Sequence, residues 1–227
     1  MSDTRVTLRK EGTISIITMD DGKANVFAAA MAEQLHDCLN SIDPNEGAVI
    51  ITGRPKFFSA GFDLKTIQGG DVQAGLEMRT KTINMTMDLL AFPRPVVAAC
   101  TGHCMAMGAL FMLTMDYRIG VRGPFKIGLN EVRDSLSLPF FGIELPRYRL
   151  PTHSFIKSAL HSELYEADAA VEAGFLDEAV DPEDLMDVAM AKAQDLSQLP
   201  NPGYHSTKLN VVGELRDRIL ESMKPLN

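Results

Sequence analysis

The sequence predicts an α/β fold with a helical C-terminal region, and three observations support this prediction. Two unbroken apolar segments, 48–52 and 95–100, have the composition of buried parallel strands. A helical pattern over 74–90 separates them, as the crossover between parallel strands requires. From residue 152 onward the strand patterns give way to a series of helical segments.

The N-terminal part is predicted to begin with a strand and then a helix. Frequent β-branched residues predict a strand over 13–19, and the residues 20–22 (Asp-Asp-Gly) form a turn after it. Apolar residues at helical spacing predict a helix over 27–42. Asn25 is a candidate for the cap of this helix.

The remaining elements continue this alternation. A helix-like apolar stretch over 106–115 precedes a third strand over 117–121. Strands separated by helices indicate a mostly parallel sheet with right-handed crossovers. The last third predicts four helices, which cover 152–160, 166–172, 183–199 and 204–223.

Composition and charge limit the class of protein. The 227 residues, of which 45% are apolar, suffice for one sizeable core. The longest apolar runs are shorter than the roughly 20 residues that cross a bilayer, so no membrane span is expected. Residues 1–5 lack the order of a secretory signal, and the three cysteines do not form an even disulfide set. We therefore expect a cytoplasmic protein.

The formal net charge is −8, and the sequence contains no basic cluster. Proteins that bind DNA or RNA present concentrated positive charge to the phosphates, so no nucleic-acid partner is expected. An anionic ligand would need positive groups close to its binding site.

Two turns that contain glycine follow the predicted strands 48–52 and 95–100. The first turn covers 59–65 and the second covers 101–110. Small residues let a ligand approach the main chain, and the start of a helix presents unpaired N–H groups. Together the turns could direct two N–H groups at one carbonyl oxygen, although the first turn alone is more typical of an ordinary loop.

Glu131 is the best candidate for a general base. It lies in the largely apolar segment 127–132, and burial of a carboxylate raises its pKa. The alternative is an exposed glutamate, which is the commoner state of this residue type. Asp63 and Asp116 are interpreted as hydrogen-bond acceptors at a turn and at a strand end.

Other kinds of site are disfavoured. Cys100, His103 and Cys104 resemble half of a zinc site, but no second half-site follows at a comparable spacing, so no metal is expected. The sequence contains no Gly-x-Ser-x-Gly elbow of a serine hydrolase, no P-loop and no dinucleotide-binding glycine motif after a strand.

Three segments taken together resemble the crotonase (enoyl-CoA hydratase/isomerase) superfamily. They are 58–65, 102–108 and 116–119, and their order and spacing match that family over most of the chain. The resemblance implies a crotonase-like spiral of β-β-α units over residues 1–180. It also implies a helical oligomerisation region over 181–227 and a homotrimer or dimer of trimers.

The resemblance also assigns residues to an acyl-coenzyme A (acyl-CoA) site. The backbone N–H groups of Phe62 and Met107 would form an oxyanion hole, and coenzyme A would be part of the substrate rather than a separate cofactor. The family usually has glycine at the position of Met107, so the bulkier side chain is expected to narrow or reshape the acyl pocket. The residues expected to hold coenzyme A are Lys23, Ala24, Val26, Ser59, Ala60, Asp63 and Leu64.

The carboxylates indicate which reaction to expect. Hydratases of this family use two glutamates, and this chain has Leu110 at one position and Glu131 at the other. One base suffices to move a double bond, so the resemblance favours conversion of 3-enoyl-CoA to 2-enoyl-CoA by Glu131. The segment 127–131, with Pro139 and Phe140, resembles the Δ3,Δ2-enoyl-CoA isomerase branch. Leu110, Pro139 and Phe140 are therefore expected in the acyl pocket.

Two alternatives remain open at this stage. The chain could be an enoyl-CoA hydratase or another crotonase-type acyl-CoA lyase or hydrolase, or it could be a subunit that binds acyl-CoA without turnover. The region after Lys208 is shorter than in typical members, whose last helices often cover the acyl pocket. Lys208 itself is expected either to meet a phosphate or to be solvated.

Overall fold

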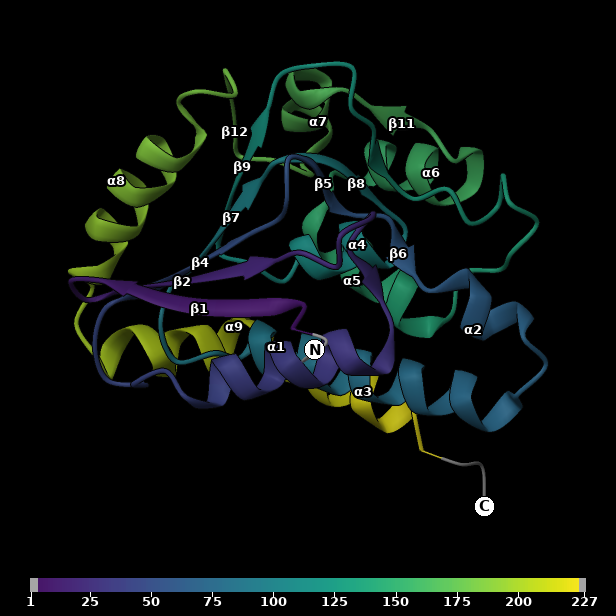
Figure 1. The fold of residues 1–227 in the computed structure, drawn as a ribbon, viewed down its shortest axis with the longest axis horizontal. Coiled ribbons are helices and arrows are strands. Elements are labelled where there is room, and N and C mark those ends of the chain that lie inside the picture. The colour runs from purple at the N-terminus through teal and green to yellow at the C-terminus, as the bar shows by residue number, and fades with distance from the viewer. Residues whose placement is uncertain (1–3, 225–227) are drawn as a thin grey trace.

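The computed structural model describes residues 4–224 and shows a mixed α/β fold (Figure 1). The expectation that the N-terminus carries no secretory signal rests partly on residues 1–3, which lie outside the described residues. Residues 225–227 at the end of the predicted C-terminal region also lie outside them. In the part of the chain that the structure describes, no helix is long and apolar enough to cross a membrane.

The largest sheet has six strands in the order β1-β2-β4-β7-β9-β12. Within this sheet β1 and β2 are antiparallel, and the other neighbours are parallel. The strands predicted over 13–19, 48–52, 95–100 and 117–121 are confirmed, whereas the two edge strands were not predicted. The six strands are β1 (Val6–Glu11), β2 (Ile14–Met19), β4 (Ala48–Thr52), β7 (Val96–Cys100), β9 (Tyr117–Val121) and β12 (Glu178–Val180).

Short strands build two further sheets beside the large one. A four-stranded sheet has the order β11-β10-β8-β5, and β3 pairs with β6 in parallel. Because β4 is followed by β5, and β7 by β8, each central strand continues into the second sheet before a helix begins, which is the β-β-α unit. The short strands are β3 (Val26–Phe27), β5 (Lys56–Ser59), β6 (Gly61–Phe62), β8 (Gly102–Met105), β10 (Ile127–Gly128) and β11 (Leu164–Tyr165).

Nine helices lie within the described residues, and they include every helix that the sequence predicted. The two that were not predicted, α2 and α5, follow the turns beside the site. The helices are α1 (Ala29–Asn40), α2 (Leu64–Gln68), α3 (Val72–Leu90), α4 (Met107–Met112), α5 (Phe140–Arg149), α6 (Thr152–His161), α7 (Ala167–Ala173), α8 (Leu185–Ser197) and α9 (Gly203–Ser222).

The expected cap of the first helix was wrong. Ala28, not Asn25, precedes α1 as its N-cap. Asn25 is fully buried at a φ of 52°, and its amide donates hydrogen bonds to the carbonyl oxygens of Met19 and Phe57. Asparagine tolerates this left-handed conformation, and its amide satisfies backbone acceptors that burial would otherwise leave unpaired.

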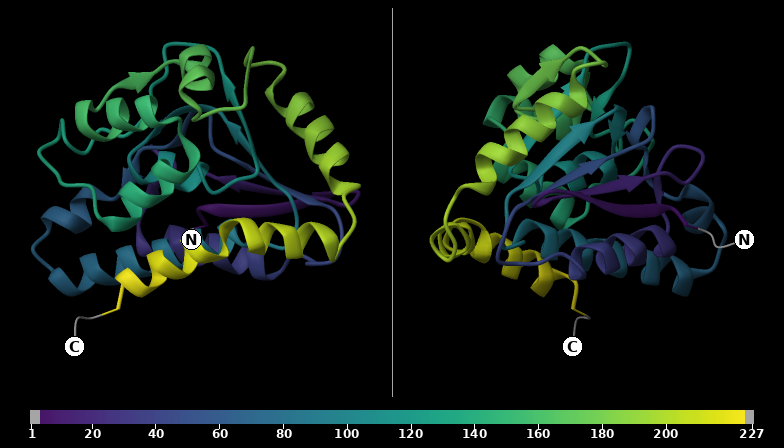
Figure 2. Two further views of the ribbon diagram at one scale, coloured as in Figure 1. Left: turned by 180° about the vertical axis from the view of Figure 1, so that it is seen from behind. Right: turned by 60° about the vertical axis from the view of Figure 1, so that its left-hand side comes forward.

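Both faces of the central strands are buried. In β4, Val49 and Ile51 belong to one hydrophobic cluster, whereas Ala48 and Ile50 belong to the other. Helix α8 covers the second face, where Ala189 and Ala193 let it lie close to the sheet (Figure 2). A fully buried Val, Ile or Leu side chain stabilises the fold by roughly 1.5–3 kcal/mol.

Helix α9 packs on α3 and α5 of its own chain. Its Lys208 is buried, and Nζ lies 2.7 Å from Oδ2 of Asp116, which also accepts a hydrogen bond from the N–H of Val96 at 2.8 Å. The interpretation of Asp116 as a strand-end acceptor is confirmed. Of the two alternatives for Lys208, solvation was wrong, because the side chain is buried and its ammonium pairs with Asp116. Contact with a phosphate stays a prediction. Burial lowers the pKa of Lys208, and the Asp116 carboxylate opposes this shift.

Candidate active site

A cavity of about 410 Å³ lies between α3, α4, the segment that follows β10 and the end of α9. Its walls are mainly apolar. Six residues that the sequence assigned to the oxyanion hole, the base and the acyl pocket line this one cavity. They are Phe62, Met107, Leu110, Glu131, Pro139 and Phe140.

The Phe62 N–H is placed by the pairing of β6 with β3. The next amide, that of Asp63, donates to the carbonyl oxygen of Phe27 on β3 at 3.2 Å. Because successive amides of a strand point to opposite sides, the N–H of Phe62 points away from β3. The Phe62 N–H therefore forms no hydrogen bond with β3.

Gly61 lets the first turn approach the second closely. A Cβ atom at Gly61 would lie 3.3 Å from the backbone nitrogen of Met107 and 2.9 Å from Cβ of Ala106. The φ of Gly61 is +97°, a conformation that residues with a side chain rarely adopt. The two turns predicted to converge are thus in contact at the cavity.

Met107 begins α4, so its N–H has no acceptor within the helix. The preceding Ala106 has a φ of 51° and a ψ of −128°, which is strained for a residue other than glycine. Two hydrogen bonds hold it there. Its N–H donates to the carbonyl oxygen of Gly128 at 3.0 Å, and its own carbonyl oxygen accepts from the N–H of Leu110 at 3.1 Å.

Glu131 follows β10 and supplies the one carboxylate among the described residues that line the cavity. Its Oε2 is buried, and no described residue donates a hydrogen bond to it. Burial raises the pKa of Glu131, and the nearby Asp134 carboxylate adds to this effect, whereas the backbone N–H groups of Glu131 and Asn130 oppose it. A carboxylate with a raised pKa and an unpaired oxygen is suited to accept a proton.

The segments predicted to hold coenzyme A lie side by side, next to the cavity rather than in its wall. The N–H of Ala60 donates to the carbonyl oxygen of Ala24 at 2.9 Å, and Val26 pairs with Gly61 across the β3–β6 ladder. Lys23 and Leu64 are exposed.

The side chains of Ser59 and Asp63, which belong to this group, form hydrogen bonds within the chain. The hydroxyl of Ser59 is buried and donates to the carbonyl oxygen of Asn25 at 2.6 Å. Asp63 is the N-cap of α2, where it accepts hydrogen bonds from the N–H of Lys65 and, at 2.8 Å, from the hydroxyl of Thr66. The interpretation of Asp63 as a turn acceptor is therefore confirmed.

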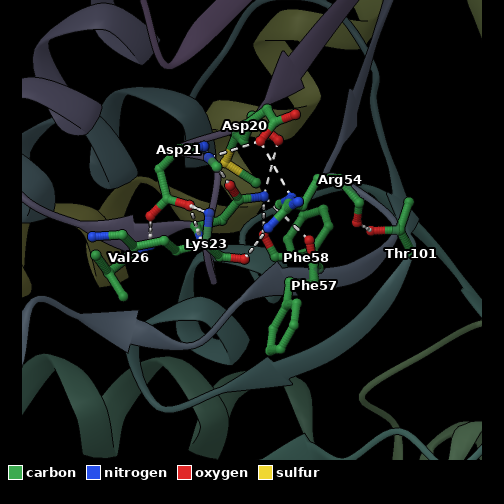
Figure 3. A network of polar contacts seen from close by, with 11 residues as sticks. Asp20, Asp21, Lys23, Val26, Arg54, Phe57, Phe58 and Thr101 are labelled. Atoms are coloured by element: carbon green, nitrogen blue, oxygen red, sulfur yellow. Dashed lines mark hydrogen bonds and ion pairs between the residues drawn. The ribbon is translucent and has the colours of Figure 1, made fainter. Parts of the chain in front are cut away.

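A polar network fixes the loop that carries Lys23 (Figure 3). The carboxylate of Asp21 accepts hydrogen bonds from the N–H groups of Lys23, Asn25 and Val26, and the guanidinium of Arg54 donates to the carbonyl oxygen of Lys23. Burial tends to raise the pKa of Asp21, but the three N–H donors and the charge of Arg5 lower it overall.

The three residues that resemble half of a zinc site, Cys100, His103 and Cys104, are packed or hydrogen-bonded within the chain. Cys100 and Cys104 are buried, as expected for small apolar residues. Nδ1 of His103 accepts a hydrogen bond from the N–H of Lys126 at 3.0 Å. Within residues 4–224, no three His, Cys, Asp or Glu side chains are grouped so that they could hold a metal ion.

Sequence reasoning missed several residues of the cavity wall. Arg79 lies on α3 between Leu76 and Ile83, which also line the cavity. The helical spacing of Leu76 and Ile83 predicts a shared face, and Arg79 falls on that face at three and four residues from them. No comparable signal identifies Ser137, because it precedes an unpredicted helix. The end of α9 also contributes Ser222 and Met223.

Comparison with known proteins identifies the family. The model of the family described as "Enoyl-CoA hydratase/isomerase" matches residues 9–224. The chain belongs to this family. The predicted resemblance to the crotonase superfamily is thereby confirmed.

Solved structures of the family confirm the predicted fold. An enoyl-CoA hydratase/isomerase family protein from Pseudomonas syringae is 33% identical, with a TM-score of 0.93 over 96% of this chain and 95% of that one. An enoyl-CoA isomerase from Mycobacterium tuberculosis is 31% identical, with a TM-score of 0.90 over 98% and 97% of the two chains. Human mitochondrial Δ3,Δ2-enoyl-CoA isomerase, at 23% identity and a TM-score of 0.91, shares the fold.

Curated relatives carry both names of the family. A probable enoyl-CoA hydratase of Mycobacterium avium is 32% identical over 169 residues, which are 72% of this chain and 63% of the relative. The matches to the first three relatives span between 57% and 63% of their lengths. A peroxisomal enoyl-CoA delta isomerase of Arabidopsis thaliana is 23% identical over 96% of this chain and 90% of the relative. These names do not choose between hydration and isomerisation.

Proposed function

We propose that this chain is an acyl-CoA enzyme that converts 3-enoyl-CoA to 2-enoyl-CoA, with Glu131 as its single acid/base. The observation that supports this reaction is the one buried carboxylate in the described wall of an otherwise mainly apolar cavity. Hydration within this family is expected to use a second glutamate to orient water, and the buried Leu110 stands at that position.

In the proposed mechanism the thioester carbonyl oxygen accepts hydrogen bonds from the N–H groups of Phe62 and Met107. Glu131 removes a proton from C2, and the negative charge spreads onto the carbonyl oxygen, where the two donors stabilise it. The protonated Glu131 then returns the proton to C4, so the double bond lies between C2 and C3. Base and donors recover their initial states.

The decisive experiment supplies 3-hexenoyl-CoA and 2-hexenoyl-CoA separately and follows the products by chromatography. The wild type is expected to form 2-hexenoyl-CoA from the first substrate. Glu131→Gln is expected to lower this rate on the order of 10²–10⁴-fold, because the amide cannot accept the proton. Glu163→Gln, the same change at a half-buried residue outside the cavity, serves as the matched control.

Each remaining outcome contradicts the proposal in a different way. Formation of 3-hydroxyhexanoyl-CoA from 2-hexenoyl-CoA at a comparable rate would identify a hydratase. Binding of both thioesters without any product would identify a non-catalytic subunit. Isomerisation that survives in Glu131→Gln would assign the proton transfer to another residue.

The assembly stays part of the proposal. We propose a homotrimer or dimer of trimers, with a core over 1–180 and an oligomerisation region over 181–227. Exposed apolar side chains on α6 and α9, including Leu160 and Val211, are compatible with contacts between copies. Light scattering of the purified chain tests this, and a monomer at micromolar concentration would contradict it.

A further inference from the structure

Arg79 is the one positively charged side chain that lines the cavity among the described residues. It occupies the face of α3 that Leu76 and Ile83 share, where the helix otherwise presents apolar side chains to the cavity.

No described residue neutralises Arg79. The two glutamates near it in sequence and on the neighbouring helix, Glu77 and Glu33, both contact Lys81 instead. No hydrogen bond or ion pair joins the Arg79 side chain to another described residue. Arg79 is exposed to water.

An arginine at this position affects different acyl chains in opposite ways. An apolar acyl chain that filled the cavity would remove water from the guanidinium without replacing its hydrogen bonds, which costs free energy. An acyl chain that ends in a carboxylate would replace them with two charge-assisted hydrogen bonds. Glu131 repels a second carboxylate near the reacting carbons, so the favourable place for one is the Arg79 side of the cavity.

We propose that Arg79 binds a carboxylate at the far end of the acyl chain, so that the substrate class is the mono-CoA thioesters of unsaturated dicarboxylic acids. This rests on the proposed function, because it assumes that the thioester carbonyl lies at Phe62 and Met107. The role of Arg79 is to select the substrate, and it takes no part in the proton transfer.

Binding of unreactive thioesters tests this directly by calorimetry. Hexanoyl-CoA and adipoyl-CoA form a pair that differs only at the last carbon, and octanoyl-CoA and suberoyl-CoA form a longer pair. Arg79→Leu is expected to weaken the better-binding dicarboxylic thioester roughly tenfold, as for one charge-assisted pair near the surface. The same variant should bind the apolar thioesters as tightly as the wild type or more tightly.

Two further variants and one further ligand complete the design. Arg79→Lys should recover part of the preference, because it restores the charge but not the planar fork. Arg9→Leu removes an exposed arginine from β1 and should change nothing. Free coenzyme A should bind the wild type and Arg79→Leu equally. An equal loss for all thioesters and for free coenzyme A would place Arg79 on the coenzyme and overturn the proposal, as would no loss for either dicarboxylic ligand.

The proposed function can fail separately from this inference. Turnover of 3-hexenoyl-CoA depends on Glu131 and the two N–H donors but not on Arg79, whereas the ratio of kcat/KM between 3-hexenedioyl-CoA and 3-hexenoyl-CoA depends on Arg79. If neither compound is isomerised but the binding preference appears, only the reaction is wrong. If 3-hexenoyl-CoA is isomerised and the ratio is the same in wild type and Arg79→Leu, only the substrate class is wrong.

Discussion

The contact between the two turns can be tested by adding one methyl group at Gly61. In Gly61→Ala the new Cβ would lie 2.9 Å from Cβ of Ala106, 3.2 Å from the carbonyl oxygen of Met105 and 3.3 Å from the nitrogen of Met107. The first of these distances is shorter than real Cβ contacts, so the two turns must separate. The separation moves the N–H groups of Phe62 and Met107 apart.

The size of the effect follows from two terms. Loss of one oxyanion donor lowers kcat on the order of 10²–10³-fold, because a misplaced N–H no longer meets the developing charge. The φ of +97° disfavours any side chain, and strain of this kind costs roughly 1–3 kcal/mol of unfolding free energy. We therefore expect a folded variant with a far lower kcat and a smaller change in KM.

The assay measures kcat and KM for 3-hexenoyl-CoA, and circular dichroism follows unfolding in urea. Gly213→Ala is the matched control, since a Cβ at that position in α9 meets no atom within 4 Å. It should leave kcat unchanged and raise the unfolding free energy by about 0.5–1 kcal/mol, the usual gain for Gly to Ala in a helix. A folded Gly61→Ala enzyme with kcat within about threefold of the wild type would refute the oxyanion geometry.

Three other predictions concern charged groups. Burial raises the pKa of Glu131, and its ionised form is the base. We therefore expect kcat/KM to rise with pH through an apparent pKa above the usual glutamate value. A value of kcat/KM that is independent of pH from 4 to 8 would contradict this. Lys208→Met should cost about 1–3 kcal/mol in urea unfolding by leaving the half-buried Asp116 without its partner. Adding Asp116→Asn should recover part of the loss, and additive losses would contradict a direct pairing. The pKa of Asp21 is lowered in the folded chain, so its stabilisation is present above the usual pKa of 3.8 and is lost as pH falls through the lower, folded pKa. The difference in Tm between wild type and Asp21→Ala should therefore shrink in acid, and a difference that does not decrease as pH falls below 3.8 would contradict it.

The central strands were predictable because their sequence signal is local. Segments such as 48–52 and 95–100 are apolar throughout, since both faces of the strand are buried under different clusters. The edge strand β1 gives no such signal, because its last residues are exposed and polar. β1 forms by pairing with β2, and β2 itself is predicted by its frequent β-branched residues.

The short strands and α5 could not be predicted from local pattern. Strands of two residues, such as β6 and β10, contain glycine and are defined by the partners they pair with across the chain. Helix α5 includes Gly142 and Pro146, two residues that disfavour a helix, and its stability comes from packing against α4, α6 and α9. The burial of Lys208 is equally non-local, because Asp116 lies 92 residues away.

The predicted site residues divide according to whether the backbone or the side chain is proposed to act. In the proposed mechanism Phe62 and Met107 contribute N–H groups, which any residue other than proline supplies, so their side chains are free to shape the cavity. Glu131 contributes a carboxylate, and no other residue type except aspartate could replace it as the same kind of base. Substrate preference can therefore change at Met107 or Arg79 while the proposed proton transfer is retained. This separation explains why the family could be recognised from its turns, whereas the substrate had to be inferred from the cavity wall.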